Sequence, residues 1–470
     1  MEGEQHYDKK YAQKSLLIFA AFIIIVMYIE TMIISSLPSI AKQFDVNAAN
    51  VSLVLSMYIV AGVALSPIVG KLADIYGKKK VLIRVLAIYS ISVALTGFAP
   101  NFTSLVILRA FQGIGLTVFP LAISLIQEQF PRDKVPQALG IVGAMFGAGM
   151  SIGLPIGSFV SNTYGWQITY FTAVPFVLLF SILIGLFIKE SRHMQPDAKV
   201  DYIGSIGLAV FLGSLVFALS EGATFGWGSN AIILLFAFAI LVFALLIPYE
   251  KKNADAVLDF NLLKIRNVVA ANLIFLAVGI GIFLAYQTFV YQFESPVPTG
   301  YGQSIFATGL LMVPFAIMSL IIPPIVGRFL PRFGVKPFYL FGSALTILGF
   351  LVAAFAPSIL YLVIGAALVG IGLSGLNIPT MNLLVLSVEG RQIGLAASMN
   401  SVFGFFGSAL GAPIAGVLIA VFGSAAAFQY SYFVAIIMSI IIIVISLFAK
   451  EVLGPTAAIK IPDSRVIKEV

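Results

Sequence analysis

The sequence contains no cysteine and only two histidines, His6 and His193. The lack of cysteine excludes disulfide bonds, thiol catalysis and cysteine-ligated structural zinc. His6 falls in the hydrophilic N-terminal tail and His193 in a hydrophilic connection between apolar runs, so neither can relay protons inside a membrane. The zinc-peptidase pattern H-E-x-x-H is also absent. We therefore predict no cofactor, no metal site and no enzymatic activity.

Charged residues are scarce as well. They make up 10% of the chain, whereas about a quarter of the residues of a soluble domain are charged. Hydrophobic residues make up 60% and form repeated runs, each close to the 20 or so residues that a membrane-spanning helix needs. The pattern predicts an all-α polytopic membrane protein with 14 transmembrane helices, near residues 15–38, 49–69, 81–98, 103–127, 137–159, 167–188, 202–221, 231–249, 268–292, 304–326, 337–355, 359–386, 393–419 and 428–449.

The basic residues fix the expected orientation of these spans. With both termini in the cytoplasm, all of the 27 basic residues except Lys42 and Arg109 fall on the cytoplasmic side or in the cytoplasmic tails. This is the positive-inside bias, and it predicts a multi-pass protein of the cell membrane, inner or plasma, with both termini cytoplasmic. Because the charges are spread over short loops that face anionic lipids, we expect membrane lipids and no nucleic acid as partners.

An internal repeat divides the chain. PIVGKLADIYGKK at 67–79 matches PIVGRFLPRFGVK at 324–336, and GIGL at 113–116 recurs at 370–373, in both cases 257 residues later. Six helices return the chain to the same face, so the repeat predicts two parallel six-helix bundles, an architecture of transporters. The predicted parts are a cytoplasmic tail at 1–14, an N-terminal bundle at 15–190, a linker at 191–266 with inserted helices at about 202–221 and 231–249, a C-terminal bundle at 267–450 and a cytoplasmic tail at 451–470.

The two copies differ in their ionisable residues. Only the N-terminal copy keeps them, which indicates that they serve function rather than the shared scaffold. The aligned pairs are Glu30 with Gln287, Asp74 with Pro331, Arg109 with Ala366, and Gln112 with Val369.

Several segments resemble the major facilitator superfamily, and specifically its fourteen-helix drug:proton antiporter branch. They are GKLADIYGKKK at 70–80, LRAFQGIG at 108–115, GAGMSIGLPIGS at 147–158, DYIGSIGL at 201–208 and EGATFGWGS at 221–229. The resemblance implies the major facilitator fold with two inserted helices. It also implies proton-coupled efflux of lipophilic or cationic small molecules by alternating access, and we expect a monomer.

Arg109 and Glu30 are the predicted proton-coupling residues. Both fall at similar depth in their helices, and a lone charge there costs about 2.5–3.5 kcal/mol, so each needs a partner or a wet cavity. An arginine cannot release its proton whereas a carboxyl can, so Glu30 is the expected carrier and Arg109 its tuner. The alternatives are that Arg109 only binds carbonyls near Gly113 and Gly115, and that Glu30 is only solvated. The predicted substrate cavity contains Glu30, Tyr58, Gln112 and Gln287.

Two further sets of residues follow from the resemblance. Gly70, Asp74, Gly77 and Lys78 form the predicted gating loop, in which Asp74 would hold the start of the helix near Gly394 and so keep the inner side shut. The alternative is an aspartate that only balances the lysines at 78–80. Gly149, Gly153, Pro155 and Gly157 form the predicted helix-packing and antiporter motif.

Other functions remain open at this point. Transport of one specific metabolite or lipid is the nearest alternative, although few paired charges are available to bind a polar substrate. A channel and an intramembrane enzyme are the alternatives from other classes. Glu221, at the outer end of its helix, is expected to be solvated.

Overall fold

The structure is a computed structural model that describes residues 9–130, 135–191, 194, 199–253, 256–389, 392–423 and 425–453. Within these ranges every regular element is a helix and none is a strand, which confirms the predicted all-α class. Most of both predicted tails, 1–14 and 451–470, lies outside the described residues, as do His6 and His193.

Every predicted span is occupied by one long helix or by consecutive shorter ones. The uninterrupted helices are α5 (Lys78–Thr96), α8 (Val135–Tyr164), α9 (Trp166–Phe187), α10 (Tyr202–Phe225), α11 (Asn230–Lys252), α12 (Arg266–Glu294), α15 (Val335–Ala354), α18 (Ile393–Phe422) and α19 (Ala425–Phe448). The interrupted ones are α1, η1 and α2 (Lys9–Thr31, Ile34–Ser36, Leu37–Gln43); α3 and α4 (Ala48–Val51, Leu53–Tyr76); α6, η2 and α7 (Phe102–Gln112, Gly113–Thr117, Val118–Gln129); α13 and α14 (Ile305–Leu311, Val313–Phe333); and α16 and α17 (Ile359–Gly375, Asn377–Val385).

Thirteen of these segments in the described part of the chain are long and apolar enough to cross a membrane. The fourteenth segment is α5. Its first turns carry Lys78, Lys79, Lys80 and Arg84, so the apolar part of this helix is short. It packs against α9, which is itself long and apolar enough to cross a membrane. The exact number of 14 crossings therefore stays a prediction that depends on α5.

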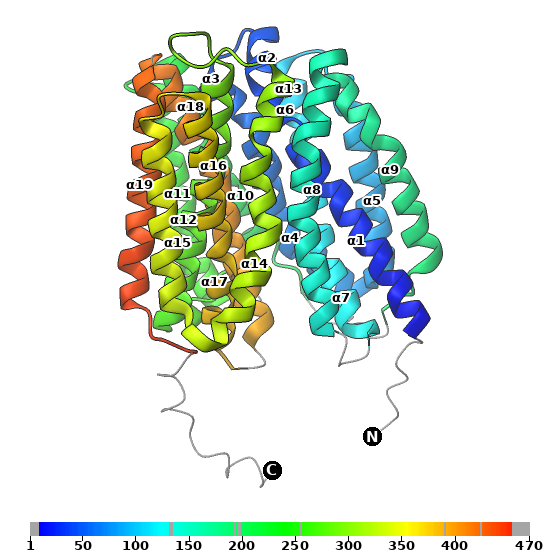
Figure 1. Ribbon diagram of the computed structural model, residues 1–470. Coiled ribbons are helices and arrows are strands. Elements are labelled where there is room, and N and C mark those ends of the chain that lie inside the picture. The colour runs from blue at the N-terminus through cyan, green and yellow to red at the C-terminus, as the bar shows by residue number, and fades with distance from the viewer. Residues whose placement is uncertain are drawn as a thin grey trace, which may run out of the picture.

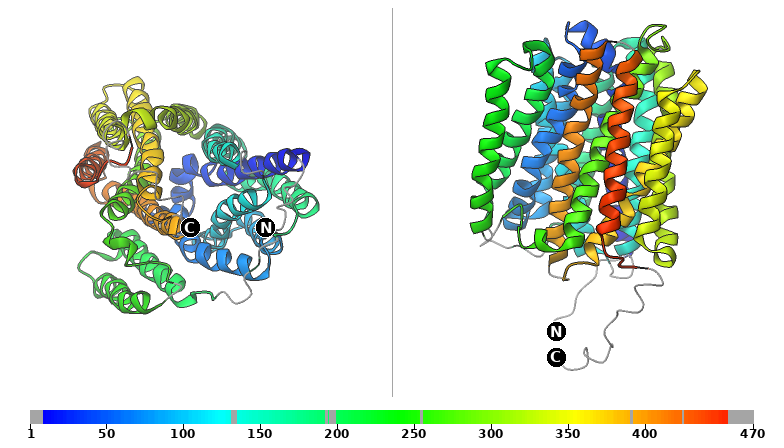
Figure 2. Two further views of the ribbon diagram at one scale, coloured as in Figure 1. Left: turned by 90° about the horizontal axis from the view of Figure 1, so that it is seen from below. Right: turned by 90° about the vertical axis from the view of Figure 1, so that its left-hand side faces the viewer.

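The helices form two groups with the inserted pair beside them. The group α1 to α9 and the group α12 to α19 lie on opposite sides of the molecule (Figure 1). Seen along the helices, α10 and α11 lie outside both groups (Figure 2). Helix α10 contacts α4 from the first group and α18 from the second. It therefore covers the line where the two groups meet.

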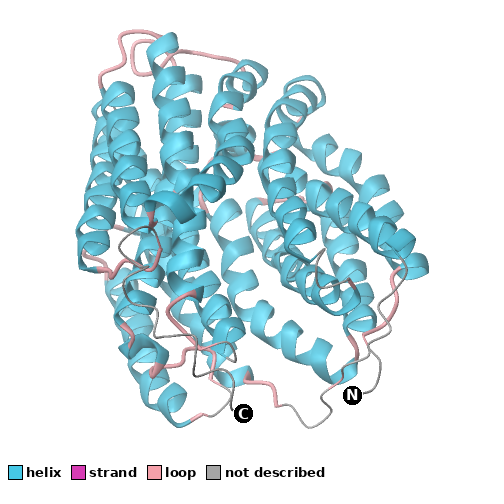
Figure 3. Cartoon of the chain, turned by 60° about the horizontal axis from the view of Figure 1, so that its bottom comes forward, coloured by secondary structure: helices cyan, strands magenta, loops and turns pink. Residues whose placement is uncertain are grey.

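The chain begins and ends its helical part at one end of the molecule. There α1 starts and α19 stops, and we call this the terminal end; the opposite end, with α2 and α13, is the far end (Figure 1). Figure 3, in which the terminal end comes forward, shows that helices make up nearly the whole body and that loops only join their ends.

The internal repeat is visible in the packing of the helices. In the first group α8 packs along α1, and in the second α18 packs along α12. Both contacts depend on glycine: a Cβ at Gly153 would meet Thr31 Oγ1, and a Cβ at Gly407 would meet the Leu276 carbonyl oxygen. Glycine lets the backbones approach where any side chain would separate them.

Candidate functional site

The site is built around the guanidinium of Arg109, which is fully buried in α6. Its Nε donates to the Val54 carbonyl of α4 at 2.9 Å, and its Nη1 donates to Gln112 Oε1 at 2.7 Å. Its Nη2 donates to Glu30 Oε2 of α1 at 3.2 Å. The expected ion pair is therefore present, and it joins three helices. Together these acceptors compensate a charge that would otherwise be costly in the membrane interior.

Glu30 is the more accessible member of the pair. Its side chain is 11% exposed, compared with 1% for Arg109. While Oε2 accepts from Arg109, Oε1 has no hydrogen-bond partner within the described part of the chain. One carboxylate oxygen is thus held by the cation. The other is itself buried, with the Tyr58 hydroxyl close to the carboxylate, and is left to bind a proton.

Tyr58 and Gln112 complete the surroundings of the pair, as the sequence predicted. The Tyr58 ring centroid lies 4.8 Å from Arg109 Cζ, within the range of a cation–π contact. The Gln112 amide accepts from Arg109 and donates to Thr96 Oγ1 of α5 at 2.5 Å. Sequence reasoning missed the Val54 carbonyl and Thr96, because neither a backbone oxygen nor a threonine stands out within an apolar run.

The alternative role considered for Arg109 named the wrong carbonyls. Arg109 binds the Val54 oxygen in α4 rather than carbonyls around Gly113 and Gly115. Those two glycines instead admit neighbouring helices: a Cβ at Gly113 would meet the Tyr58 carbonyl oxygen, and one at Gly115 would meet the Tyr89 ring. They set the position of α4 and α5 around the buried cation.

The glycines of α8 lie against the segment of α1 that carries Glu30. Cβ atoms at Gly149 and Gly153 would collide with Met27 and Thr31 of α1, and one at Gly157 would collide with Met32, the residue after α1. The close packing predicted for this motif is therefore present, and Pro155 lies within the same helix.

Residues 149–153 also have the spacing G-x-S-x-G, but Ser151 is an interior helix residue whose hydroxyl donates to the Gly147 carbonyl at 2.7 Å. It does not occupy a nucleophile elbow.

Gln287 lies elsewhere than the sequence suggested. It is fully buried near the far end, where its Nε2 donates to the Ala48 carbonyl oxygen at 2.8 Å. A Cβ at Gly416 would meet the same carbonyl. Residues from α12 and α18 thus close onto the start of α3. In this conformation Gln287 joins the two helix groups instead of lining an open cavity with Glu30.

A second contact between the groups lies at the far end. Phe159 of α8 packs edge-on against Phe306 of α13, with ring centroids 5.6 Å apart. One turn away, a Cβ at Gly309 of α13 would collide with Ser158 Oγ. With the contact at Ala48, this closes the far end of the molecule on two sides.

The predicted gating residues lie together at the terminal end. Asp74 is 3.9 Å from Lys78 Nζ, and Lys78 also pairs with Glu128 of α7. Gly77 ends α4 with a φ of 102°, and Gly70 has open space beside its Cα. Among the hydrogen bonds of the described residues, none joins Asp74 to α18, and residues 390 and 391, which precede that helix, lie outside the described part of the chain. The contact of Asp74 with the start of that helix therefore stays a prediction.

Each group also carries a capping glutamate that sequence reasoning missed. Glu190, after α9, accepts from the backbone N–H groups of Lys79 and Lys80 at 2.7 and 3.1 Å. Glu451, after α19, accepts in the same way from Val335 and Lys336 at 2.8 and 3.0 Å. A carboxylate at a helix N-terminus satisfies free donors and interacts favourably with the helix dipole.

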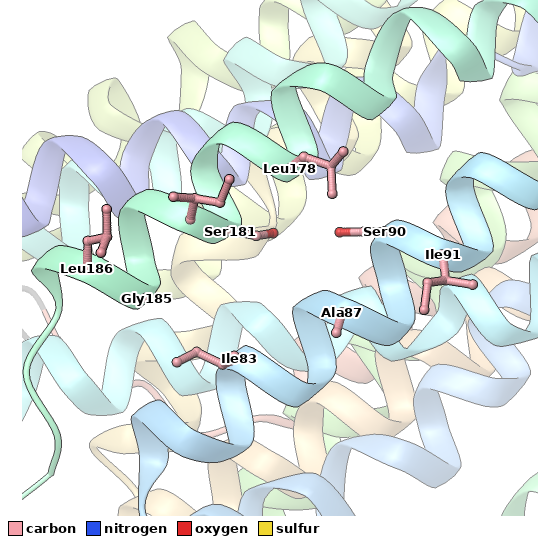
Figure 4. Close-up of a pocket in the computed structure, with 9 residues that line it drawn as sticks. Ile83, Ala87, Ser90, Ile91, Leu178, Ser181, Gly185 and Leu186 are labelled. Atoms are coloured by element: carbon pink, nitrogen blue, oxygen red, sulfur yellow. The ribbon is translucent and has the colours of Figure 1, made fainter.

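Two surface hollows lie away from the Glu30–Arg109 pair. One, of about 500 Å³, lies between α5 and α9; Ser90 and Ser181 face each other across it in an otherwise apolar lining (Figure 4). The other, of about 510 Å³, is lined by Asp45, Glu221 and neighbouring polar residues. Neither is lined by residues of the pair, so neither is the predicted substrate cavity.

Comparisons with known proteins agree with this geometry. The family model described as Major Facilitator Superfamily matches residues 18–201 and 275–466. Multidrug resistance protein 3 of Bacillus subtilis (strain 168) is 32% identical over 374 residues, which are 78% of this chain and 71% of that protein. Multidrug transporter protein MdtP of the same organism is 30% identical over 77% of this chain and 67% of that protein.

A more distant relative and a solved structure extend the comparison. Multidrug resistance protein Stp of Mycobacterium tuberculosis (strain CDC 1551 / Oshkosh) is 25% identical over 85% of this chain and 74% of that protein. The crystal structure of a bacterial homolog of the human lysosomal transporter Spinster, in an inward-facing and unoccupied conformation, superposes with a TM-score of 0.69. It covers 94% of this chain and 97% of its own at 15% identity, and so shows a shared fold. This multi-pass membrane transporter therefore belongs to the major facilitator superfamily.

Proposed function

We propose that this transporter exports lipophilic or cationic small molecules in exchange for protons, by alternating access. The observation that carries the proposal is the Glu30–Arg109 pair, buried between α1, α4 and α6 with one carboxylate oxygen unpartnered. Three similar proteins bear multidrug names, which supports the substrate class. Few ionisable groups surround the pair, and this favours amphipathic compounds over a defined polar metabolite.

The two members of the pair have different roles in the proposed cycle. Arg109 keeps its charge throughout, because a guanidinium does not lose its proton in a protein. Glu30 binds a proton when water is excluded from its carboxylate. It releases that proton when water or a cationic substrate reaches Oε1. Substrate binding and proton binding then exclude each other at one carboxylate, which is what antiport requires.

We further propose an orientation for the molecule. The terminal end would face the cytoplasm of a cell whose plasma membrane holds the transporter as a monomer. The contacts of Ala48 with Gln287 and Gly416 would then close the outer side. In that orientation the described conformation is closed on the outer side.

Proton release by the purified full-length chain tests the coupling. We expect the addition of tetraphenylphosphonium, a lipophilic cation, to release protons from the wild type in weakly buffered detergent solution. Glu30→Gln should bind this probe more weakly and release none, and it should lose transport driven by a pH gradient in proteoliposomes. Glu221→Gln, the same change in another membrane helix, serves as the matched control and should behave as the wild type. Normal gradient-driven transport by Glu30→Gln would remove Glu30 from the coupling mechanism.

A further inference from the structure

Two carboxylates that the proposed transport cycle does not use face each other at the terminal end of the inserted helices. Asp201 is the residue before α10, and Glu250 lies in the last turn of α11. Asp201 is 7% exposed and Glu250 is 2% exposed. Acidic side chains are almost never buried to this degree without a partner.

One oxygen of each carboxylate is bound by donors. Asp201 Oδ1 accepts from the Gly204 backbone N–H at 2.9 Å and from the Tyr249 hydroxyl at 2.8 Å. Glu250 Oε2 accepts from the backbone N–H of Leu258 at 2.8 Å. The pair thus joins the start of α10, the end of α11 and the segment that leads to α12.

The other two oxygens have no donor. Asp201 Oδ2 and Glu250 Oε1 are inaccessible to solvent and have no hydrogen-bond partner in the described part of the chain. A Cβ placed on Gly204 would collide with both atoms, so the two oxygens lie within a few ångströms of each other beside this glycine. Two ionised carboxylates in this position would repel each other in a site from which water is excluded.

The basic residues of these segments point elsewhere. Lys251 and Lys252 are exposed, and Lys251 Nζ lies over the Phe260 ring, 5.4 Å from its centroid. Lys264 donates to Asn261 Oδ1 at 3.0 Å. Lys199, two residues before Asp201, and Arg266, at the start of α12, are both exposed. Of the acidic groups on the adjoining elements, Asp259 accepts from the Asn261 backbone N–H, and Asp74 of α4 pairs with Lys78. None of the described ion pairs involves Asp201 or Glu250.

We propose that Asp201 and Glu250 share one proton and form a proton-binding site at the junction of the inserted helices with the C-terminal group. The proton lies on Glu250 and is donated to Asp201 Oδ2. Two observations assign it this way. Asp201 lies at the N-terminus of α10, where a negative charge is favoured, and its Oδ1 also accepts from the Tyr249 hydroxyl. Glu250 lies at the C-terminus of α11, where a negative charge is disfavoured, and its donors are backbone N–H groups at Val257 and Leu258.

This assignment predicts an asymmetry between the two conservative variants. In Glu250→Gln the amide NH₂ replaces the acid O–H as donor to Asp201, and the amide oxygen still accepts from Leu258. In Asp201→Asn the negative charge at the start of α10 is lost. In the folded wild type the pair holds a proton at pH values at which the same carboxyl of the unfolded chain is already ionised. The free energy of unfolding should therefore fall as the pH rises through the value at which the folded pair loses that proton.

The test measures thermal unfolding of the full-length protein in detergent from about pH 6 to pH 9, together with infrared spectra. We expect Glu250→Gln to unfold at or above the wild-type temperature. Its unfolding temperature should also decline less towards high pH than that of the wild type. Asp201→Asn should unfold several degrees lower at every pH. The wild-type minus Glu250→Gln infrared difference should contain the carbonyl band of a protonated carboxylic acid. Asp259→Asn, a change of an acid on the adjoining segment, is the matched control and should leave this band in place.

Three results would overturn the proposal. One is the absence of the protonated-acid band from the difference spectrum at pH 7. Another is Glu250→Gln being as destabilised as Asp201→Asn. The third is stabilisation of the chelator-treated wild type, but not of Glu250→Gln, by added Ca²⁺ or Mg²⁺, which would identify a cation site. None of these results bears on Glu30, because the two carboxyl sites lie on different helices.

Discussion

Arg109 Nη2 lies 3.2 Å from Glu30 Oε2, and this pair connects α6 to α1 in the interior of the N-terminal group. Removal of one partner of a buried pair leaves the other charge uncompensated, which is strongly destabilising. We therefore expect Arg109→Ala alone to lower stability more than Arg109→Ala combined with Glu30→Gln does. In a double-mutant cycle on thermal or denaturant unfolding, the coupling should be about 0.5–3 kcal/mol. Additive effects would mean that Arg109 is held by the Val54 carbonyl and Gln112 independently of Glu30.

The contact between α8 and α1 gives a second prediction. A methyl group at Gly153 would collide with Thr31 Oγ1 and the Tyr28 carbonyl oxygen, next to Glu30. Gly153→Ala should cost about 1–3 kcal/mol of stability, as overpacking does, and should reduce transport. Gly140→Ala is the matched control in the same helix, because nothing lies within 4 Å of a Cβ there. Alanine has the higher helix propensity, so that variant should be neutral or slightly stabilised. Equal behaviour of the two variants in thermal unfolding would contradict the packing role.

The repeated caps give a third prediction. Glu190 and Glu451 each accept from two backbone N–H groups at the start of a helix in their own group. Alanine at either position should lower the stability of the purified protein by about 0.5–2 kcal/mol, the usual range for a lost cap. Glutamine should cost less, because its amide oxygen can still accept. If Glu190→Ala were neutral while Glu451→Ala was not, the two caps would not be equivalent.

These sites show what the sequence could and could not predict. The apolar runs predicted the spans, and the depth of Glu30 and Arg109 within them predicted that the two could meet. Depth does not say which way a helix faces, so Gln287 was expected in a cavity although it lies in the far-end contact. The Asp201–Glu250 pair was missed for a related reason: Asp201 precedes the first inserted helix and Glu250 lies near the end of the second, so nothing in the sequence shows that their side chains meet.

The proposed orientation gives a fourth prediction, which the absence of cysteine makes easy to test. Lys80 and Arg332 are exposed at the terminal end, and Val297 is exposed at the far end. Single cysteines at 80 and 332 should resist a membrane-impermeant thiol reagent added to intact cells and should react after permeabilisation. A cysteine at 297 should react in intact cells and serves as the positive control. Labelling of position 80 or 332 from outside would reverse the orientation.

The last prediction concerns the two ends of the molecule, which should respond oppositely to mutation. Gln287 closes the far end by donating to Ala48, whereas Asp74 is expected to close the terminal end in the other conformation. Loss of a contact made in only one state shifts the equilibrium away from that state. Gln287→Ala should therefore increase the population open at the far end, and Asp74→Asn should increase the population open at the terminal end.

Spin labels on cysteines that replace Lys42 and Phe422 would report the distance across the far end, and labels at Lys80 and Arg332 the distance across the terminal end. Gln287→Ala should lengthen the first distance and shorten the second, and Asp74→Asn should do the reverse. Distance distributions unchanged by Asp74→Asn would leave this aspartate as a partner of Lys78 alone, with no part in gating.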